Sequence, residues 1–290
     1  MTDNNKFKKL SCSPESDKDF NFSCYDEDDI NKLKLAYNKR HKDDPIKTND
    51  PKKIWETLRF RYHNVCNKES CWLRQNFVSN KLGKELIHSF APKSPNTWEK
   101  NDRTWLSSNE INQVMKQYEN RYKCFEFIGP SPIDYDTYDD NNNCIWPELC
   151  YFNVSDKLKK RKFKIGIIFN LDKHDQPGSH WVSLFIHLKN KTIYYFDSVK
   201  SNNHDNPIPP EILRFVKKIQ DQGKENKMDL TFEHNDKLVH QTKNTECGMY
   251  SLYFIINMLK DTKTWDNFMK VRIKDDDVHK FRKIYFNQDI

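Results

Sequence analysis

Residues 240–259 read HQTKNTECGMYSLYFIINML, and the second half of this stretch is almost continuously apolar. The run that follows Cys247 is too long for a typical strand, so it predicts a buried helix whose first turn contains Cys247. Unpaired amide hydrogens and the positive end of the helix dipole at such a position stabilise a thiolate over a thiol. The stretch therefore predicts a nucleophilic cysteine, although a small buried hydrophobic residue is an equally good interpretation of Cys247 taken alone.

Two further residues of this stretch suit acyl-transfer chemistry. Gln241 lies six positions before Cys247 and carries a side-chain amide that can donate a hydrogen bond to an oxyanion. The backbone amide of Cys247 is the natural second donor. Gly248 is expected to leave the approach to the sulfur free of a side chain. Together these features predict an oxyanion hole beside the cysteine.

A base and an acid come from an expected β-hairpin upstream. Residues 179–188 read SHWVSLFIHL and residues 192–197 read TIYYFD, with a short turn between them. Because the second strand runs back along the first, Asp197 should return to the end where His180 begins. His180 can then take the proton of Cys247 while Asp197 fixes the imidazole tautomer. Weaker alternatives are His174 and His240 for the base, and Asp172, Asp175 and Asp205 for the acid.

The remaining pattern predicts an α+β fold with an N-terminal helical domain over residues 1–98 and a catalytic domain over residues 99–290. In the catalytic domain, a mixed sheet should pack against the Cys247 helix in a papain-like, adenain-like core. The expected helices cover about 28–39, the residues from 50 onward, 72–90, 107–122, the residues from 210 onward and 278–284. The expected strands cover about 163–171, 181–188, 192–197 and 230–233, and residues 129–143 are expected to form an acidic loop.

These residues resemble a known family. The pattern Gln241, Asn244, Glu246, Cys247 and Gly248 is similar to the nucleophile motif of the SUMO and ubiquitin-like-specific cysteine proteases. His180-Trp181 resembles their His-Trp pair, and Asp197-Ser198 resembles the end of their second hairpin strand. The resemblance extends over about residues 104–290 with the motifs in the family's order. Within the superfamily, the likeness is greatest to the polyprotein-processing proteases of large DNA viruses, of the African swine fever virus type.

The resemblance implies a function and roles for single residues. His180, Asp197 and Cys247 would form the triad, and Gln241 would donate to the oxyanion. Trp181 would wall a narrow slot for a Gly-Gly stretch, with Gly248 and Asn244 as further substrate-binding residues. The implied substrates are viral polyproteins or structural precursors with Gly-Gly motifs, cut in the virion or the host cytoplasm. The N-terminal domain would stabilise the catalytic domain or present substrate to it.

Three other functions use the same residues. An isopeptidase would remove a SUMO-like or ubiquitin-like tag from host proteins. An acetyltransferase would use the same triad with an acyl cofactor. A scaffold that only binds Gly-Gly tails would need no chemistry, and the complete set of His180, Asp197, Cys247 and Gln241 argues against it.

Composition excludes several other classes of protein. The chain of 290 residues contains no apolar run long enough to cross a bilayer and starts with polar residues, so neither a signal peptide nor a membrane anchor is expected. Eight dispersed cysteines favour reduced thiols over a disulfide framework. Cys66, Cys71 and His63 lack a fourth zinc ligand nearby, so no metal and no cofactor are expected. A net charge of +7 and the basic segment 157–162 predict at most a weak nucleic-acid contact.

Overall fold

The computed structural model describes residues 7–16, 20–200 and 207–288. The chain divides into two compact units. One comprises Met1–Glu99 together with Lys283–Ile290, and the other comprises Lys100–Arg282. The C-terminal segment from Lys283, which the sequence analysis places in the catalytic domain, thus groups with the N-terminal unit.

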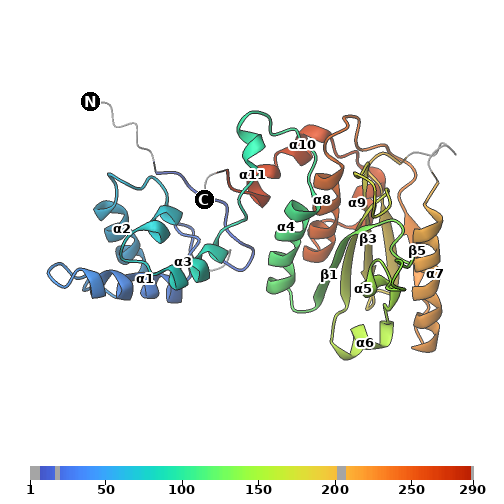
Figure 1. The fold of residues 1–290 in the computed structure, drawn as a ribbon, viewed down its shortest axis with the longest axis horizontal. Helices are drawn as coiled ribbons and strands as arrows, with labels where there is room; N and C mark the ends of the chain where they lie inside the picture. Colours follow the sequence, from blue (N-terminus) through green and yellow to red (C-terminus); the bar gives the residue numbers. More distant parts are fainter. Residues whose placement is uncertain (1–6, 17–19, 201–206, 289–290) are drawn as a thin grey trace. The chain divides into compact units, whose positions relative to one another are not determined.

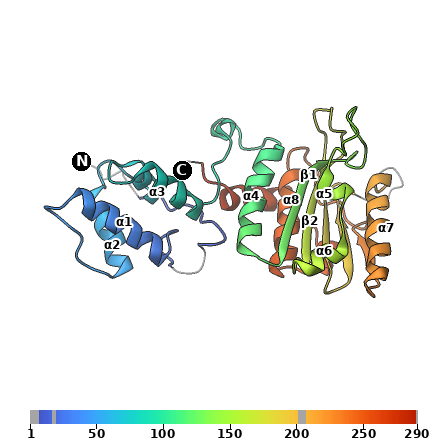
Figure 2. The ribbon, with the colours of Figure 1, turned by 60° about the horizontal axis from the view of Figure 1, so that its bottom comes forward.

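The N-terminal unit is helical (Figures 1 and 2). Its α-helices are α1 (Glu27–Arg40), α2 (Pro51–Arg61) and α3 (Asn80–Leu86), with 3₁₀ turns at Glu69–Arg74, Ile87–Ser89 and Asn96–Glu99. Asp26 caps α1 by accepting from the amide of Asp29, and Asp50 caps α2 directly before Pro51. The first two helices therefore begin where the sequence predicts them.

The expected helix over residues 72–90 was wrong, because the chain forms a 3₁₀ turn and the short helix α3 instead. The Gln75 side-chain amide donates to the carbonyl of Cys71 at 3.2 Å, and the Ser79 hydroxyl accepts from the amide of Leu82 at 3.3 Å. These side chains bind backbone groups that a continuous helix would pair internally. Hydrogen bonds from these polar side chains to the backbone therefore interrupt a stretch whose apolar pattern fits one long helix.

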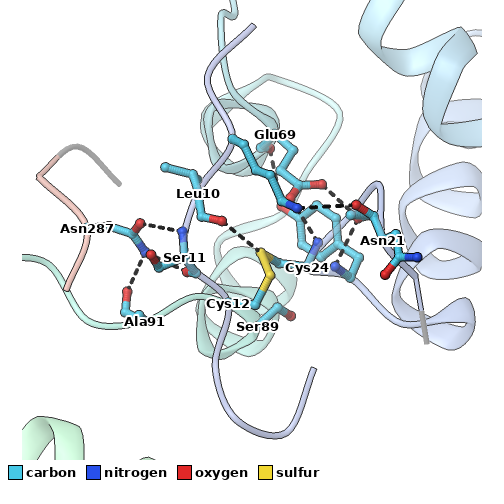
Figure 3. The surroundings of a disulfide bond; sticks show 12 residues. Leu10, Ser11, Cys12, Asn21, Cys24, Glu69, Ser89, Ala91 and Asn287 are labelled. Carbon is cyan, nitrogen blue, oxygen red and sulfur yellow. Dashed lines mark hydrogen bonds between the residues drawn. A yellow bond between two sulfur atoms is a disulfide. The ribbon is translucent and has the colours of Figure 1, made fainter. Parts of the chain in front are cut away.

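The expectation of reduced thiols was also wrong. Disulfides join Cys12 to Cys24, Cys66 to Cys71, and Cys144 to Cys150, which leaves Cys124 and Cys247 as free cysteines. Figure 3 shows the first bridge beside Ser11, whose backbone is held by the Asn287 side chain. Asn287 also donates to the carbonyl of Ala91 at 2.9 Å. The disulfide and these hydrogen bonds thus hold the segments around Ser11 and Asn287 in the N-terminal unit.

The unit Lys100–Arg282, which contains the predicted catalytic residues and is called the catalytic unit below, is organised by a five-stranded sheet in the order β1-β2-β3-β4-β5. The strands are β1 (Phe125–Pro132), β2 (Lys164–Asn170), β3 (Trp181–His187), β4 (Thr192–Phe196) and β5 (Thr231–His234). β3 is antiparallel to its neighbours β2 and β4, whereas the edge strands β1 and β5 pair in parallel with β2 and β4 respectively. The mixed sheet confirms the predicted α+β class.

Helices cover both faces of this sheet (Figure 1). α7 (Pro210–Glu225) buries Phe215 and its apolar neighbours in a core shared with β2, β3 and β4. α8 (Cys247–Lys260) packs on β3 and β2, and α4 (Ser108–Arg121) packs on β1 and α8. At Gly166 of β2, a Cβ atom would lie 2.8 Å from Ile255 of α8, so this glycine permits the close approach. The nucleophile helix is thereby fixed against the centre of the sheet.

The sequence did not predict β1 or the short helices α5 (Pro147–Cys150), α6 (Val154–Lys159) and α9 (Trp265–Lys270). The single helix expected over 278–284 is divided between α10 (Asp275–His279) and α11 (Arg282–Tyr285). β1 carries Pro130 and Pro132, which weaken a strand pattern, but an edge strand tolerates proline because one of its sides has no ladder to fill. Among the described residues, no helix combines the length and apolar character needed to span a membrane.

Candidate active site

The hairpin of β3 and β4 brings His180 and Asp197 together. His180 directly precedes β3, Asp197 directly follows β4, and Ser183 pairs with Phe196 in the antiparallel register. His180 Nε2 lies 2.7 Å from Asp197 Oδ1. The Asp197 side chain is 2% exposed and the His180 side chain 17% exposed. A nearly dry carboxylate thus holds one nitrogen of a partly accessible imidazole.

Cys247 is the first residue of α8 and lies on the other side of the imidazole. Its sulfur is within hydrogen-bonding reach of the His180 ring. The residue is 2% exposed, and the apolar helix behind it is buried along almost its whole length. An imidazole, a carboxylate and a sulfur therefore meet where β3 begins, β4 ends and α8 begins.

The electrostatics of this cluster favour a protonated imidazole. Burial lowers the pKa of His180, but hydrogen bonds to Asp197 and Cys247 and attraction to both raise that pKa to about 10. At neutral pH the ring is therefore an imidazolium. A cation of this kind stabilises an adjacent thiolate.

Gln241 is buried and is oriented by Ser198, the residue that follows Asp197. Its side-chain oxygen accepts from the Ser198 hydroxyl at 2.7 Å, and its backbone amide donates to the Ser198 carbonyl at 2.8 Å. The side-chain amide nitrogen donates to the carbonyl of Lys243. Ser198 thus determines which end of the Gln241 amide is the donor end. The motif that contains Gln241 is visible in the sequence, but the contact of Gln241 with Ser198 is not.

Asn235 is a further site residue that sequence reasoning missed. It follows β5, is 1% exposed, and accepts from the Asp197 amide at 2.9 Å while donating to the Asp197 carbonyl at 2.7 Å. Asp197 Oδ1 also accepts from the amide of Val199. Asp197 is therefore fixed through its backbone as well as its side chain. Only the parallel pairing of β4 and β5 brings Asn235 here.

Trp181 and Gly248 pack together beside the sulfur. The Trp181 indole donates to the carbonyl of Leu106 at 2.9 Å. A Cβ atom at Gly248 would lie 3.0 Å from Leu106 Cβ and 3.3 Å from Trp181 Cδ1. A side chain at position 248 would therefore press against these two residues, while the open approach to the sulfur stays a prediction. Glycine is required at this position because the tryptophan and leucine pack directly over the start of α8.

A cleft of about 620 Å³ borders the site at Trp181, and its lining includes neither His180 nor Cys247. Its walls include Trp105 and Leu106, the end of β1 at Pro130, Trp146, and the loop before β3. The Trp105 indole donates to the backbone carbonyl of Asn244 at 2.5 Å, while Asn244 itself is exposed. The cleft leads from solvent to the residue next to His180.

The weaker alternatives for base and acid lie in other environments. His174 Nδ1 lies 2.7 Å from Asp134, and Asp172 accepts from the Ser179 hydroxyl. His240 is fully buried, and burial first, with repulsion from Arg272, lowers its pKa to about 4. Asp175 is exposed, and Asp205 lies outside the described residues.

The basic segment 157–162 is partly engaged within the chain. Lys157 pairs with Glu126 at 2.7 Å, and Lys162 donates to the carbonyl of Phe125 at 2.7 Å. A nucleic-acid contact through the remaining cations stays a prediction.

Comparison with known proteins assigns the chain to a family. Residues 109–290 match the Ulp1 protease family, C-terminal catalytic domain. The chain belongs to the Ulp1 protease family. It is therefore a cysteine protease, and its membership agrees with the buried cysteine at the start of α8.

The relatives of this Ulp1-family protease include two viral proteins. A putative thiol protease of Acanthamoeba polyphaga mimivirus is 29% identical over 95% of this chain and 92% of its own length. A cysteine protease of African swine fever virus (isolate Tick/Malawi/Lil 20-1/1983) is 27% identical over 76% of this chain and 83% of its own. The crystal structure of the African swine fever virus protease superposes with a TM-score of 0.67 at 21% identity, covering 96% of this chain and 95% of the viral one. The fold is thus shared across both units of the chain.

Proposed function

We propose that this protein is a cysteine endopeptidase of a large DNA virus that processes viral polyprotein and virion precursors after Gly-Gly. The observation that carries the proposal is the 2.7 Å contact of His180 with Asp197, on a ring whose other neighbour is the Cys247 sulfur. The two viral relatives described as thiol and cysteine proteases support the viral setting. The site of action is then the virion and the host cytoplasm.

The arrangement supports a two-step acyl transfer. The Cys247 thiolate attacks the carbonyl carbon of the scissile bond, and the carbonyl oxygen takes the negative charge. The Cys247 amide and the Gln241 side chain stabilise that charge, with Gln241 exchanging the Lys243 carbonyl for the oxyanion. His180 Nδ1 is the nitrogen that protonates the leaving amine, because Nε2 is held by Asp197. A water that then gives its proton to His180 hydrolyses the thioester and restores the enzyme.

The packing around Trp181 gives the Gly-Gly preference a steric reason. Trp181 and Leu106 already lie against the start of α8, where a Cβ atom at Gly248 would lie 3.0 to 3.3 Å from them. We infer that substrate backbone passes these two side chains on its way to the sulfur. Residues without a Cβ atom are the ones that fit.

The test compares wild type with Cys247→Ser on virion precursor proteins that contain Gly-Gly, reading new termini by mass spectrometry. Cys124→Ser is the matched control, because Cys124 is the other free cysteine and is exposed. We expect cleavage after Gly-Gly by wild type and Cys124→Ser, and a loss on the order of 10⁴-fold or more in Cys247→Ser. Equal cleavage by Cys247→Ser would reject the proposal.

Substrate form separates the other functions that the triad allows. Short Gly-Gly-X peptides and their Gly-Ala-X counterparts are compared with a SUMO-like isopeptide conjugate and with acetyl-CoA plus a lysine acceptor. We expect the Gly-Gly-X peptides to be cut. Turnover confined to the conjugate would replace the proposal with an isopeptidase, and acetyl transfer would replace it with an acetyltransferase.

A further inference from the structure

Glu246, the residue before the nucleophile, is a fully buried carboxylate in a buried ion pair. One of its oxygens accepts from Arg282 Nε at 3.1 Å and from Arg282 Nη2 at 3.0 Å. The other lies 3.0 Å from His279 Nδ1. Glu246 is 0% exposed and Arg282 is 2% exposed. Burying two charges costs desolvation free energy, which their mutual attraction offsets only when the hydrogen-bond geometry is good. Stability alone therefore does not account for this pair.

Contacts around Glu246 come from both ends of the catalytic unit, because Arg103 Nη1 from its start also lies 3.8 Å from the carboxylate. Arg282 also donates to the carbonyl of Thr104 at 2.7 Å, and His279 Nε2 lies 3.1 Å from Asp102. Residues 102–104 open this unit and residues 279–282 close it. Burial first lowers the pKa of Arg282, while attraction to Glu246 opposes that effect. The two ends of the unit are therefore joined at the residue that precedes Cys247.

The same C-terminal segment also binds the start of residues 240–246, the loop that precedes Cys247 and is called the cysteine loop below. Asp275 accepts from the amide of Thr242 at 3.1 Å and from its hydroxyl at 2.7 Å. The amide of Ile273 donates to His240 Nδ1 at 3.2 Å. Residues 240–246 are thus fixed at one end by Ile273 and Asp275, and at the other end by His279 and Arg282.

We propose that Glu246 is a positioning residue that fixes the loop carrying the two oxyanion donors. Through Arg282 and His279 it sets the direction of the Cys247 amide, and the clamped loop sets the position of the Gln241 side chain. Glu246 itself touches no reacting atom. This inference rests on the proposed endopeptidase function and adds a residue to the same site.

Positioning of this kind acts on turnover more than on substrate affinity. The oxyanion forms only in the transition state, so a displaced donor loop lowers kcat while the ground-state complex is little changed. Alkylation of the Cys247 sulfur by iodoacetamide forms no oxyanion. It depends on the contact with His180, which the hairpin of β3 and β4 supplies.

The test replaces Glu246→Gln in the full chain and measures cleavage of a Gly-Gly-X peptide. We expect kcat to fall about 100-fold, as for a misplaced catalytic geometry, while KM changes by less than about threefold. The rate of Cys247 alkylation, measured in a Cys124→Ser background, should stay within about threefold of the parent. Glu69→Gln is the matched control, because Glu69 is likewise a buried glutamate but lies in the N-terminal unit. It should leave kcat unchanged.

A double variant covers the case in which Glu246→Gln does not fold because the buried Arg282 charge is no longer compensated. Glu246→Gln with Arg282→Met removes both charges, so that no buried charge is left uncompensated, and it should fold and show the same loss in kcat. An unchanged kcat in folded variants would overturn the inference, as would an alkylation rate that falls in parallel with kcat. If wild type itself cuts no Gly-Gly substrate, the proposed function fails. If wild type and variants cut equally, only the role of Glu246 fails.

Discussion

The two units of this protein each bury a glutamate, and they hold it in opposite ways. In the N-terminal unit, Glu69 accepts from the Ser23 hydroxyl, the Cys24 amide and the Trp55 indole (Figure 3 shows the surroundings). In the catalytic unit, Glu246 is paired with the Arg282 guanidinium. Neutral donors next to a disulfide hold the first carboxylate, and a cation from the far end of the unit holds the second.

The difference reflects how each unit is built. The N-terminal unit has short helices, an aromatic core and two disulfides, so local cross-links stabilise it. The catalytic unit has a central sheet covered on both faces, and Asp275, His279 and Arg282 form long-range hydrogen bonds to the cysteine loop. Local cross-links stabilise the N-terminal unit. In the catalytic unit, the packing of helices on the sheet also positions the residues of the candidate site.

Core truncation gives the largest expected effect and tests whether the units are independent. Trp72→Ala and Phe254→Ala each remove a side chain that is 0% exposed, one in each unit, and should each cost about 3 to 5 kcal/mol of unfolding free energy. Hydrogen exchange read by mass spectrometry in increasing denaturant locates the loss. Trp72→Ala should weaken peptides from residues 20–90, and Phe254→Ala those from 100–282. Equal weakening of both regions by either variant would show a single cooperative unit.

Removal of a disulfide should have an intermediate effect confined to the N-terminal unit. Cys12→Ala with Cys24→Ala opens a loop of sequence separation 12, which in the chain-entropy description costs about 3 kcal/mol. The matched pair Cys66→Ala with Cys71→Ala opens a separation of 5 and should cost about 2 kcal/mol. Denaturant unfolding with peptide cleavage as a second readout checks both. A larger loss for the shorter loop would contradict the entropic reason.

The smallest expected effect is a pH dependence that comes from Glu69. Burial raises the pKa of Glu69 despite hydrogen bonds that lower it. A raised folded-state pKa means that this group's contribution is fully present below the unfolded pKa and is lost as pH rises through the folded pKa. The N-terminal unit should therefore lose this stability between those two values, and Glu69→Gln should not. Unfolding free energies of both proteins from pH 4 upward measure the difference, and parallel curves would remove Glu69 as the cause.

Much of the fold and of the candidate site is readable in the sequence. The apolar run after Cys247 and the paired β-patterns around His180 and Asp197 are local features, and the structure forms them where they are expected. The expected helix over 72–90 failed because Gln75 and Ser79 bind backbone groups that a helix needs. The strand β1 was missed because prolines mask an edge strand, whose position only the finished sheet defines.

The sequence by itself determined the cysteine helix, the hairpin that joins His180 to Asp197, and the motif that names the family, because each depends on residues close together along the chain. Only the tertiary structure decided that Ser198 orients Gln241, that Asn235 clamps Asp197, and that Arg282 pairs with Glu246. Those contacts join residues between 36 and 43 positions apart. Their side chains meet because the sheet and α8 bring distant parts of the chain together. Local sequence patterns do not predict that long-range arrangement.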